Sequence, residues 1–499
     1  MSRRAGWHGV PGGAGTLAVL AVAEFMLTLD LSIVNVALPA IRVDLGFSQG
    51  SLPWVVNGYA LTFAGFLLFG GRAADLLGGR RVFLGALGAF SGASLACGLA
   101  ADAAVLVAAR VVQGLSAGVL APVILSILTS AYREPGARDR ALAIWAGVGI
   151  GGGAIGGLLG GVLTDALSWR WIFFVNAPVG ALLLALGRVR LPRAAADRGD
   201  GRRLDVTGAI LMTGALTSLA WALIRAGEVG WASGEVMGGG ALAAALLAAF
   251  VVIEARARAP LVPLPVFRSR PLTIGNLLSF MSFVPVPAIW FLLTLYLQNV
   301  RGHPPAETGL LFLPLSLAVV GGAQLSFRVV ARVDARALCA AGGLLAACGA
   351  GWLGGLTAAT SPLWVIVPAS VAMAGGGLMV APITIAATSV PPDRGGLASG
   401  LLNTTRQFGG ALGLALLGTI AAARPRQAVA AAGATALTAG YGAAFRAGAV
   451  IFAVTAIIAA VGLPSRLGAA LESVVRPHPR EGAAVSSERD GDSEEGATR

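Results

Sequence analysis

The chain has 499 residues, of which 56% are hydrophobic and only 12% are charged. Soluble proteins carry about 25% charged residues, so this composition excludes one large water-soluble domain, whose surface would lack polar cover. All 36 cationic side chains are arginine, and the absence of lysine excludes a Walker-type ATPase site, whose phosphate-binding loop requires one.

Fourteen apolar segments have about the length that a membrane-spanning helix needs. The first contains Glu24 and Asp30 and lacks a cleavage site, so we interpret it as a membrane helix and not as a signal peptide. The sequence therefore predicts an all-α integral membrane protein, with 423–445 as an outer loop. The predicted spans are 16–38, 52–71, 82–101, 104–130, 142–164, 171–188, 207–224, 236–253, 272–297, 308–327, 337–358, 362–386, 399–422 and 443–463.

The distribution of arginine among the connections predicts the orientation of the chain. If the N-terminus is cytoplasmic, it and the six inner loops hold 22 Arg, whereas the outer loops hold only 6. Cytoplasmic loops carry such an excess, so we expect both termini in the cytoplasm of a bacterial inner membrane. The net charge of +12 is then explained by topology and anionic membrane lipids, and no nucleic-acid partner is expected.

The two ends of the chain resemble each other weakly. In span four, Gly118 precedes Ala121–Pro122, and in span twelve Gly377 precedes Ala381–Pro382; a glycine-rich span follows each. This pattern indicates a parallel repeat of two six-helix bundles with two extra central helices. The predicted domains are 1–187 for the first bundle, 188–262 for a cytoplasmic linker and the inserted helices, 263–464 for the second bundle, and 465–499 for a disordered cytoplasmic tail.

Ionisable residues inside the spans are the strongest functional candidates, because charge is costly in lipid. Asp30 in span one and Arg110 in span four could form a buried ion pair that holds or releases a proton, or one that only fixes helix packing. Glu24 is a cavity acid or an interfacial residue, and Arg406 lies in span thirteen. The three Cys and three His are scattered, so no metal site is expected, and no catalytic dyad is evident.

Polar and glycine residues of the spans complete the candidate set. Gln113 and Gly114 share the Arg110 face of their helix, and glycine-rich spans five and thirteen should pack tightly as inner helices. The expected substrate-cavity residues are Asn35, Gln113, Gly114, Asn276, Trp290, Tyr296, Gln324, Asn403 and Arg406. The expected gating residues are Gly71, Asp75, Gly78, Arg80 and Arg81 after span two, with Asp75 near a helix N-terminus, and Gly153, Gly156, Gly157 and Gly160 in span five.

Several of these segments together resemble the major facilitator superfamily, and specifically its fourteen-helix drug:proton antiporter branch (EmrB/QacA type). The resemblance covers the chain to about Ser465. It is carried by LDLSIVNVALP at 29–39, the glycine- and arginine-rich segment 70–81, RVVQG at 110–114, SWRWIFFVNAPVG at 168–180 and NTTRQFGGALG at 403–413. Two positions depart from the family pattern: Gly79 stands where arginine is usual, and Gly157 where the antiporter motif has proline.

The resemblance implies alternating access around a central cavity, with Asp30, Arg110 and Glu24 in proton coupling and no cofactor besides the proton gradient. Because spans nine to fourteen lack carboxylates, a lipophilic monovalent cation or neutral compound is the expected substrate. Alternatives are a dedicated exporter of one endogenous metabolite or self-made antibiotic, a receptor or scaffold with a transporter fold, and a membrane subunit for a separate ATPase. In none of these is the chain an enzyme. The departure at Gly157 bears on antiport and not on the fold.

Overall fold

The computed structural model describes residues 13–463, apart from Gln49, Arg133, 193–204, 258–259, Leu261, 391–394 and 423–432. The described residues form helices and no strand. Thirteen described helical segments are long and apolar enough to cross a membrane. The remaining predicted span, 399–422, lies in α17 (Gly395–Ala422), where the polar run around Arg406 interrupts the apolar sequence. The prediction of a polytopic all-α membrane protein is therefore confirmed.

The helical elements follow one another along the described chain, and some of them are two parts of one broken span. The first are α1 (Gly13–Leu45), α2 (Trp54–Leu77), α3 (Gly79–Gly98), α4 (Ala103–Ala131), α5 (Pro135–Ala166), α6 (Trp171–Phe174) and α7 (Asn176–Arg190). Next come α8 (Val206–Val229), α9 (Gly234–Arg256), η1 (Leu264–Arg268), α10 (Arg270–Phe283) and α11 (Pro285–Leu295). The remaining ones besides α17 are η2 (Tyr296–Val300), α12 (Pro305–Leu311), α13 (Leu313–Val329), α14 (Ala335–Leu353), α15 (Leu363–Leu378), α16 (Val380–Ala387) and α19 (Ala434–Gly462).

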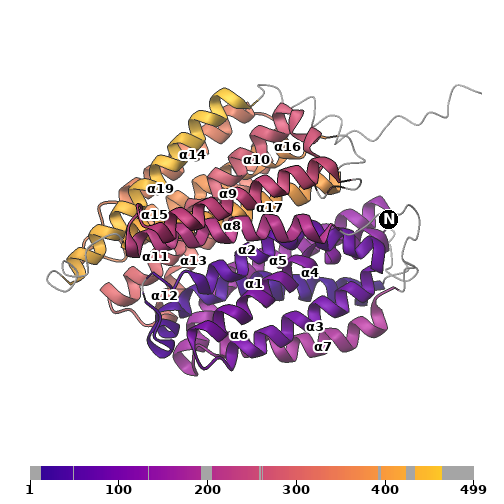
Figure 1. Cartoon of the computed structure of the whole chain (residues 1–499), viewed down its shortest axis with the longest axis horizontal. Helices are drawn as coiled ribbons and strands as arrows, with labels where there is room; N and C mark the ends of the chain where they lie inside the picture. The colour runs from indigo at the N-terminus through magenta and orange to yellow at the C-terminus, as the bar shows by residue number, and fades with distance from the viewer. Residues whose placement is uncertain are drawn as a thin grey trace, which may run out of the picture.

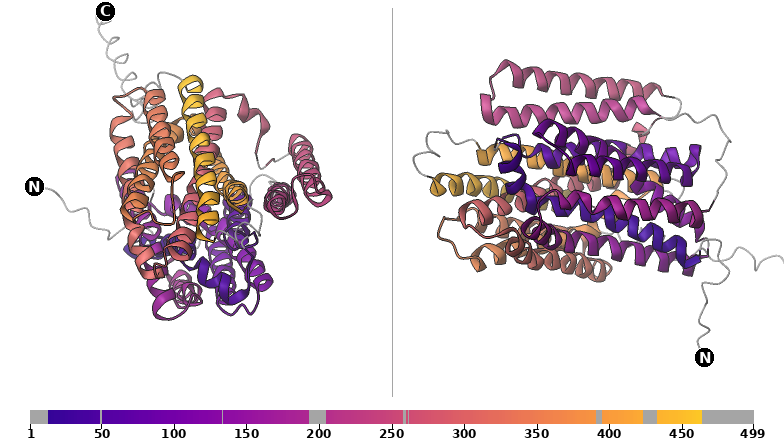
Figure 2. Two further views of the ribbon diagram at one scale, coloured as in Figure 1. Left: turned by 90° about the vertical axis from the view of Figure 1, so that its left-hand side faces the viewer. Right: turned by 90° about the horizontal axis from the view of Figure 1, so that it is seen from below.

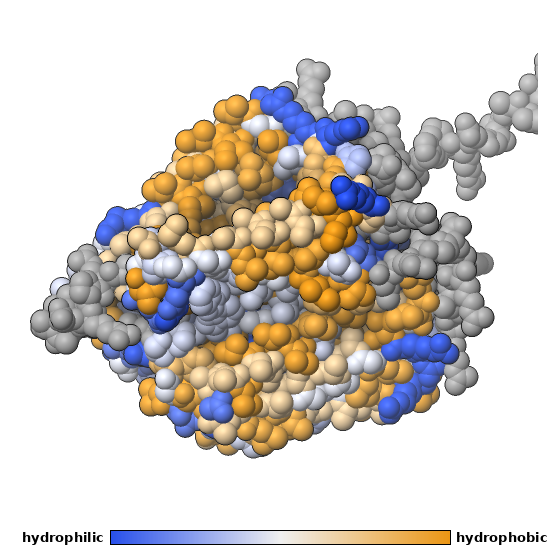
Figure 3. Space-filling model, viewed as in Figure 1, coloured by the Kyte–Doolittle hydropathy of each residue, from blue (hydrophilic) through white to orange (hydrophobic). Residues whose placement is uncertain are grey.

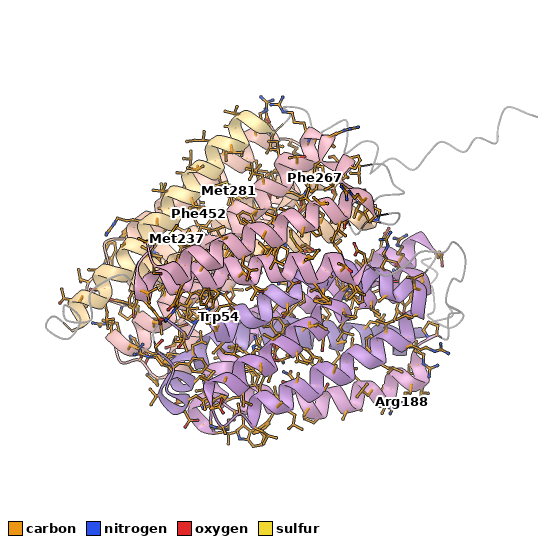
Figure 4. The ribbon with its side chains drawn as sticks, viewed as in Figure 1. Trp54, Arg188, Met237, Phe267, Met281 and Phe452 are labelled. Atoms are coloured by element: carbon orange, nitrogen blue, oxygen red, sulfur yellow. The ribbon has the colours of Figure 1, made fainter. Side chains whose placement is uncertain are left out.

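The long helices run along one common direction, which is horizontal in Figure 1. We call the end where α1 begins the Gly13 end and the other the Leu45 end. At the Gly13 end, the Tyr132 hydroxyl donates to the carbonyl of Gly13 over 2.9 Å. Arg188 and Phe267 lie toward this same end (Figure 4). Hydrophobic residues cover most of the middle of the visible face, and hydrophilic residues gather toward its two ends (Figure 3), as a bilayer-spanning body requires.

The helix pairs of the first bundle recur in the second. α1 packs on α5, α2 on α4, and α3 on both α4 and α7. In the same order, α10 and α11 pack on α17, α13 on α15, and α14 on both α15 and α19. This correspondence is the one that a parallel repeat requires. The boundaries at 187/188 and 262/263 stay a prediction.

The helices α8 and α9 form a pair beside the two bundles (Figure 2). α8 packs on α2, α17 and α9, and the Thr419 hydroxyl of α17 donates to the carbonyl of Leu223 in α8 over 2.7 Å. α9 presents large apolar side chains such as Met237 to its surroundings. Such a pair is suited to lie between the bundles and lipid without entering either bundle.

Several helices extend beyond the predicted spans; for example, α1 continues past 38 to Leu45, and α5 begins before 142, at Pro135. The helix α2 continues to Leu77, beyond the predicted end of span two at 71, because Arg72 and Asp75 do not interrupt its backbone hydrogen bonds. Helix α19 begins at Ala434 and not at 443, since the alanine-rich sequence before 443 has high helix propensity. The rest of the predicted outer loop, most of the predicted linker and the predicted disordered tail lie outside the described residues.

Candidate functional site

Asp30 in α1 and Arg110 in α4 form an ion pair in the structure. One guanidinium nitrogen of Arg110, Nη1, lies 2.8 Å from Oδ2 of Asp30, and both side chains are almost completely buried. The Arg110 Nε donates to the carbonyl of Val55 in α2 over 3.0 Å. The pair therefore joins three helices of the first bundle. Because both charges are out of water, each depends on the other for compensation.

Amide side chains complete the hydrogen bonding of the carboxylate. Oδ1 of Asp30 accepts hydrogen bonds from Gln113 over 2.8 Å and from Asn176 over 2.9 Å. Gln113 in turn accepts from Arg110 over 2.9 Å, so its amide lies between the two charges. The Asn176 amide also donates to Ser94 over 3.0 Å. We call Asp30, Arg110, Gln113, Asn176 and Ser94 the Asp30 network.

Aromatic rings enclose the cation of this network. The Arg110 guanidinium carbon lies 4.3 Å from the centroid of the Tyr59 ring and 5.7 Å from that of Phe173. Rings at these distances attract a cation through their quadrupoles, and they exclude water. The Tyr59 hydroxyl itself has no hydrogen-bond partner in the described part of the chain. A carboxylate enclosed in this way can exchange a proton only when the helices around it move.

We expect Asn176→Ala to lower protein stability and Tyr59→Phe to leave it nearly unchanged. The first substitution removes a hydrogen bond to a buried charge, which costs about 1.5–3 kcal/mol, whereas the second removes a hydroxyl without a described partner. Thermal unfolding of the purified protein in one detergent would compare the two variants. A loss in Tyr59→Phe as large as that in Asn176→Ala would contradict this ranking.

Glu24 lies nearly two helical turns before Asp30 along α1 and does not join the network. It faces α5, where a Cβ placed on Gly149 would lie 3.3 Å from Glu24 Cγ. The Trp145 indole is beside its carboxylate, yet Oε2 is buried without a hydrogen-bond partner among the described residues. An unpaired carboxylate of this kind has free capacity for a proton or a cationic group.

The helix α17 carries two polar candidates, Asn403 and Arg406, and contacts a third on α10. Arg406 is partly exposed, and its guanidinium carbon lies 5.4 Å from the centroid of the Phe283 ring. Asn403 is exposed and donates only to the carbonyl of Ser399 in its own helix, over 3.1 Å. Asn276 is buried and accepts from the Thr405 hydroxyl over 2.9 Å, which ties α10 to α17. Asn403 and Arg406 thus keep free hydrogen-bonding capacity, and Asn276 does not.

The other candidate cavity residues lie at helix contacts, bond within their own helix or are exposed. Gly114 allows α4 to approach α2, because a Cβ there would be 2.2 Å from the carbonyl oxygen of Tyr59. Trp290 is half-buried and meets the Phe312 ring edge-on at 5.0 Å. The remaining three candidates, which were expected in the same cavity, do not meet one another. Asn35 bonds only within its own helix, and the Tyr296 hydroxyl donates to the carbonyl of Thr357. Gln324 is exposed on α13.

Glycines allow α5 to pack closely against neighbouring helices on two of its faces. Toward α1, a Cβ on Gly156 would meet the Ser32 hydroxyl at 1.8 Å, and one on Gly160 the carbonyl oxygen of Ile33 at 2.3 Å. In the second bundle, Gly413 of α17 approaches the carbonyl of Val284 equally closely. The predicted close packing of spans five and thirteen is confirmed at these positions. Gly153 differs, since a Cβ there would meet nothing within 4 Å.

The second face of α5 joins the two bundles at the Leu45 end. A Cβ on Gly161 would lie 2.3 Å from the carbonyl oxygen of Pro305, and one on Gly309 would lie 2.6 Å from that of Gly157. Gln298 also donates to the carbonyl of Val36 across the bundles, over 2.8 Å. Backbone therefore meets backbone between α5 and α12. Gly157 itself has room, because its added Cβ would meet nothing closer than 3.8 Å.

The glycine- and arginine-rich segment 70–81 contains the end of α2, the linking residue Gly78 and the start of α3. Gly78 has φ of 87° and separates α2 from α3. Asp75 belongs to the last turn of α2, so it is not near a helix N-terminus as expected, and its side chain is outside the described part. Arg80 donates to the carbonyl of Arg188 at the end of α7, whereas a Cβ on Gly71 would only touch Pro122, at 3.9 Å. Arg81, at the start of α3, is exposed.

Sequence reasoning missed Asn176, Ser94 and Tyr59. Asn176 interrupts an apolar run, and this signal could have selected it, since an amide in a membrane span needs a partner. Ser94 and Tyr59 offered no such signal, because hydroxyl side chains are common in membrane helices.

Comparison with known proteins shows similarity to antibiotic export and drug resistance proteins. It is 44% identical over 416 residues to the cephamycin export protein of Amycolatopsis lactamdurans, with 82% of this chain and 85% of that protein covered. It is 38% identical over 411 residues to the puromycin resistance protein of Streptomyces alboniger, covering 81% of each. It is 36% identical over 409 residues to the multidrug resistance protein Stp of Mycobacterium tuberculosis, covering 82% and 76%.

The fold is shared with transporters of distant sequence. A D-xylose–proton symporter superposes with a TM-score of 0.63 at 13% identity, covering 90% of this chain and 98% of that one. An auto-inhibited peptide transporter of the POT family superposes with a TM-score of 0.63 at 17% identity, covering 88% and 96%. The family model of the Major Facilitator Superfamily matches residues 20–414. The chain therefore belongs to the major facilitator superfamily, as a multi-pass membrane transporter and not an enzyme.

Proposed function

We propose that this protein exports small lipophilic antibiotics or other drugs from a bacterial cell in exchange for protons. The observation that carries the proposal is the fully buried Asp30 network, together with the similarity to antibiotic exporters. Intramembrane ionisable groups are placed at a cost and commonly serve ion pathways. A carboxylate that joins α1, α4 and α7 through one cation and two amides can convert protonation into helix movement.

Exchange of substrate for protons would depend on the hydrogen bonds and the ion pair that Asp30 makes. When Asp30 takes a proton, the negative charge that holds Arg110 and both amides is lost, and the network relaxes. Release of the proton restores these bonds. Each proton that crosses the membrane contributes about 2.3 kcal/mol per 100 mV, which sustains about a fiftyfold substrate gradient.

The arrangement of the bundles supports an inward-facing state. The Leu45 end is joined by backbone contacts between α5 and α12, and the excess of loop arginine favours a cytoplasmic Gly13 end with both termini inside. Glu24 would then be reached from the cytoplasm. Its carboxylate has one buried oxygen without a hydrogen-bond partner among the described residues, which favours a cationic centre in a substrate at that position.

The second candidate is export of one self-made antibiotic. It is favoured by the names of two relatives, a cephamycin export protein and a puromycin resistance protein. Both candidates use the same site and coupling, and they differ only in substrate breadth. A drug panel and a producer-strain metabolite extract, offered to the same vesicles, would separate them.

The experiment that tests antiport is substrate-induced proton efflux from everted membrane vesicles. We expect drug addition to release protons from vesicles with the wild-type protein and not from those with Asp30→Asn. Val461→Ala is a control, because Val461 is exposed near the end of α19, a helix that carries no residue of the Asp30 network and none of the candidate cavity residues. Drug accumulation without proton movement in the wild type would refute the antiport mechanism.

A further inference from the structure

Arg406 combines two properties that membrane arginines seldom share. It lies deep inside the protein, with protein on all sides, and yet its side chain is partly solvent-exposed. Depth and partial exposure together point to a space inside the protein beside the guanidinium. Arg406 lies eleven residues after the start of α17, and Glu24 lies eleven residues after the start of α1. At the helical rise per residue, each side chain is about 16 Å from the start of its helix.

The second bundle supplies no counter-ion for this guanidinium. None of the predicted spans nine to fourteen contains Asp or Glu, and within the described chain Arg406 takes part in no ion pair or hydrogen bond. Glu24 does not pair with it either. By contrast, Arg110 donates to three hydrogen-bond acceptors, one of which is the Asp30 carboxylate. Burial of an unpaired cation is costly, so an occupant of the space should provide the negative charge.

The surroundings of Arg406 indicate what else the occupant carries. Phe283 presents its ring to the guanidinium at 5.4 Å. Ser399 and Asn403 precede Arg406 by seven and three residues, so they share its side of α17. Asn403 is exposed, with amide groups free for a ligand. The side thus offers a cation, an amide and an aromatic ring, which together suit an acidic group attached to an aromatic or other apolar body.

We propose that Arg406 is the binding site for an acidic group, a carboxylate or a sulfonate, on the exported lipophile. This inference rests on the proposed export function and extends its substrate class beyond cationic and neutral compounds. A planar guanidinium binds a carboxylate through two parallel hydrogen bonds, which lysine cannot reproduce. With Glu24 at similar depth in the other bundle, a substrate with both an amine and an acid would find a partner for each.

Equilibrium binding to the purified protein in a non-ionic detergent tests the proposal. The probes are dansyl-phenylalanine and its methyl ester, which differ by one negative charge, and dansyl fluorescence reports binding. We expect Arg406→Gln to raise the Kd of the acid about 10- to 100-fold while that of the ester changes less than about threefold. Arg406→Lys should give an intermediate Kd for the acid. Arg446→Gln is the matched control, because Arg446 is already bonded to the carbonyl of Gly354.

Three outcomes would overturn the proposal. They are an equal loss of acid and ester binding in Arg406→Gln, a wild-type protein that binds the ester and not the acid, and competition by phosphatidylglycerol that Arg406→Gln abolishes. The last result would assign the site to a lipid headgroup. Because binding is measured without a proton gradient, its failure is distinct from that of antiport, which the Asp30→Asn vesicle experiment detects.

Discussion

Replacing Arg110 with methionine should destabilise the protein more than any other single change in the Asp30 network. The substitution keeps an apolar stem of similar length but leaves the buried Asp30 carboxylate without its cation and the Val55 carbonyl without its donor. Breaking a buried ion pair on one side costs about 3–5 kcal/mol. Thermal unfolding in detergent should therefore show a large drop, and substrate-driven proton flux should vanish.

A double variant separates the ion pair's contribution to stability from its contribution to coupling. In Asp30→Asn/Arg110→Met neither charge of the pair remains, and the new amide oxygen at position 30 can still accept hydrogen bonds from Gln113 and Asn176. We expect the double variant to recover about 2 kcal/mol or more relative to Arg110→Met, as a coupling energy between neighbours, without recovering proton flux. Equal stability of the single and double variants would show that the charge of Asp30 is not what Arg110 stabilises.

Gly161→Val should reduce transport about tenfold or more by preventing closure of the Leu45 end. The first side-chain carbon would lie 2.3 Å from the carbonyl oxygen of Pro305, and the atoms it meets are backbone atoms that cannot rotate away as a flexible side chain could. The bundles must therefore separate between α5 and α12. A water-soluble maleimide should then label Val36→Cys, which is buried next to this contact, about tenfold faster than in the parent background, after replacement of the three native cysteines.

Gly157→Ala is the matched control for this experiment. A Cβ at Gly157 would meet Phe312 and Val36 at 3.8 Å or more, which is ordinary van der Waals distance. We expect Gly157→Ala to transport and to label at the parent rate. Similar labelling of Gly161→Val and its parent would mean that the α5–α12 contact does not hold this end closed.

Much of the architecture follows from the amino-acid sequence alone. Whether a segment can span a bilayer depends on the hydropathy and length of that segment, so the spans were predictable without knowing their neighbours. The same is true of the candidate coupling residues, since Asp30 and Arg110 are conspicuous in any apolar run. Boundaries were less predictable: α19 begins earlier than its hydropathy indicates, because alanine and glycine raise the hydrophobicity of a helix only a little.

Only the tertiary structure decides which polar groups meet, because that depends on the rotation and depth of each helix against its neighbours. Asn176 reaches Asp30 although they are 146 residues apart, whereas Asn35, five residues from Asp30, turns back to its own helix. Similarly, Gly153 and Gly156 belong to one motif, but one faces open space and the other a hydroxyl. Arg110 and Arg406 are both intramembrane arginines by sequence. Packing gives the first a carboxylate, and leaves the second partly exposed against the Phe283 ring.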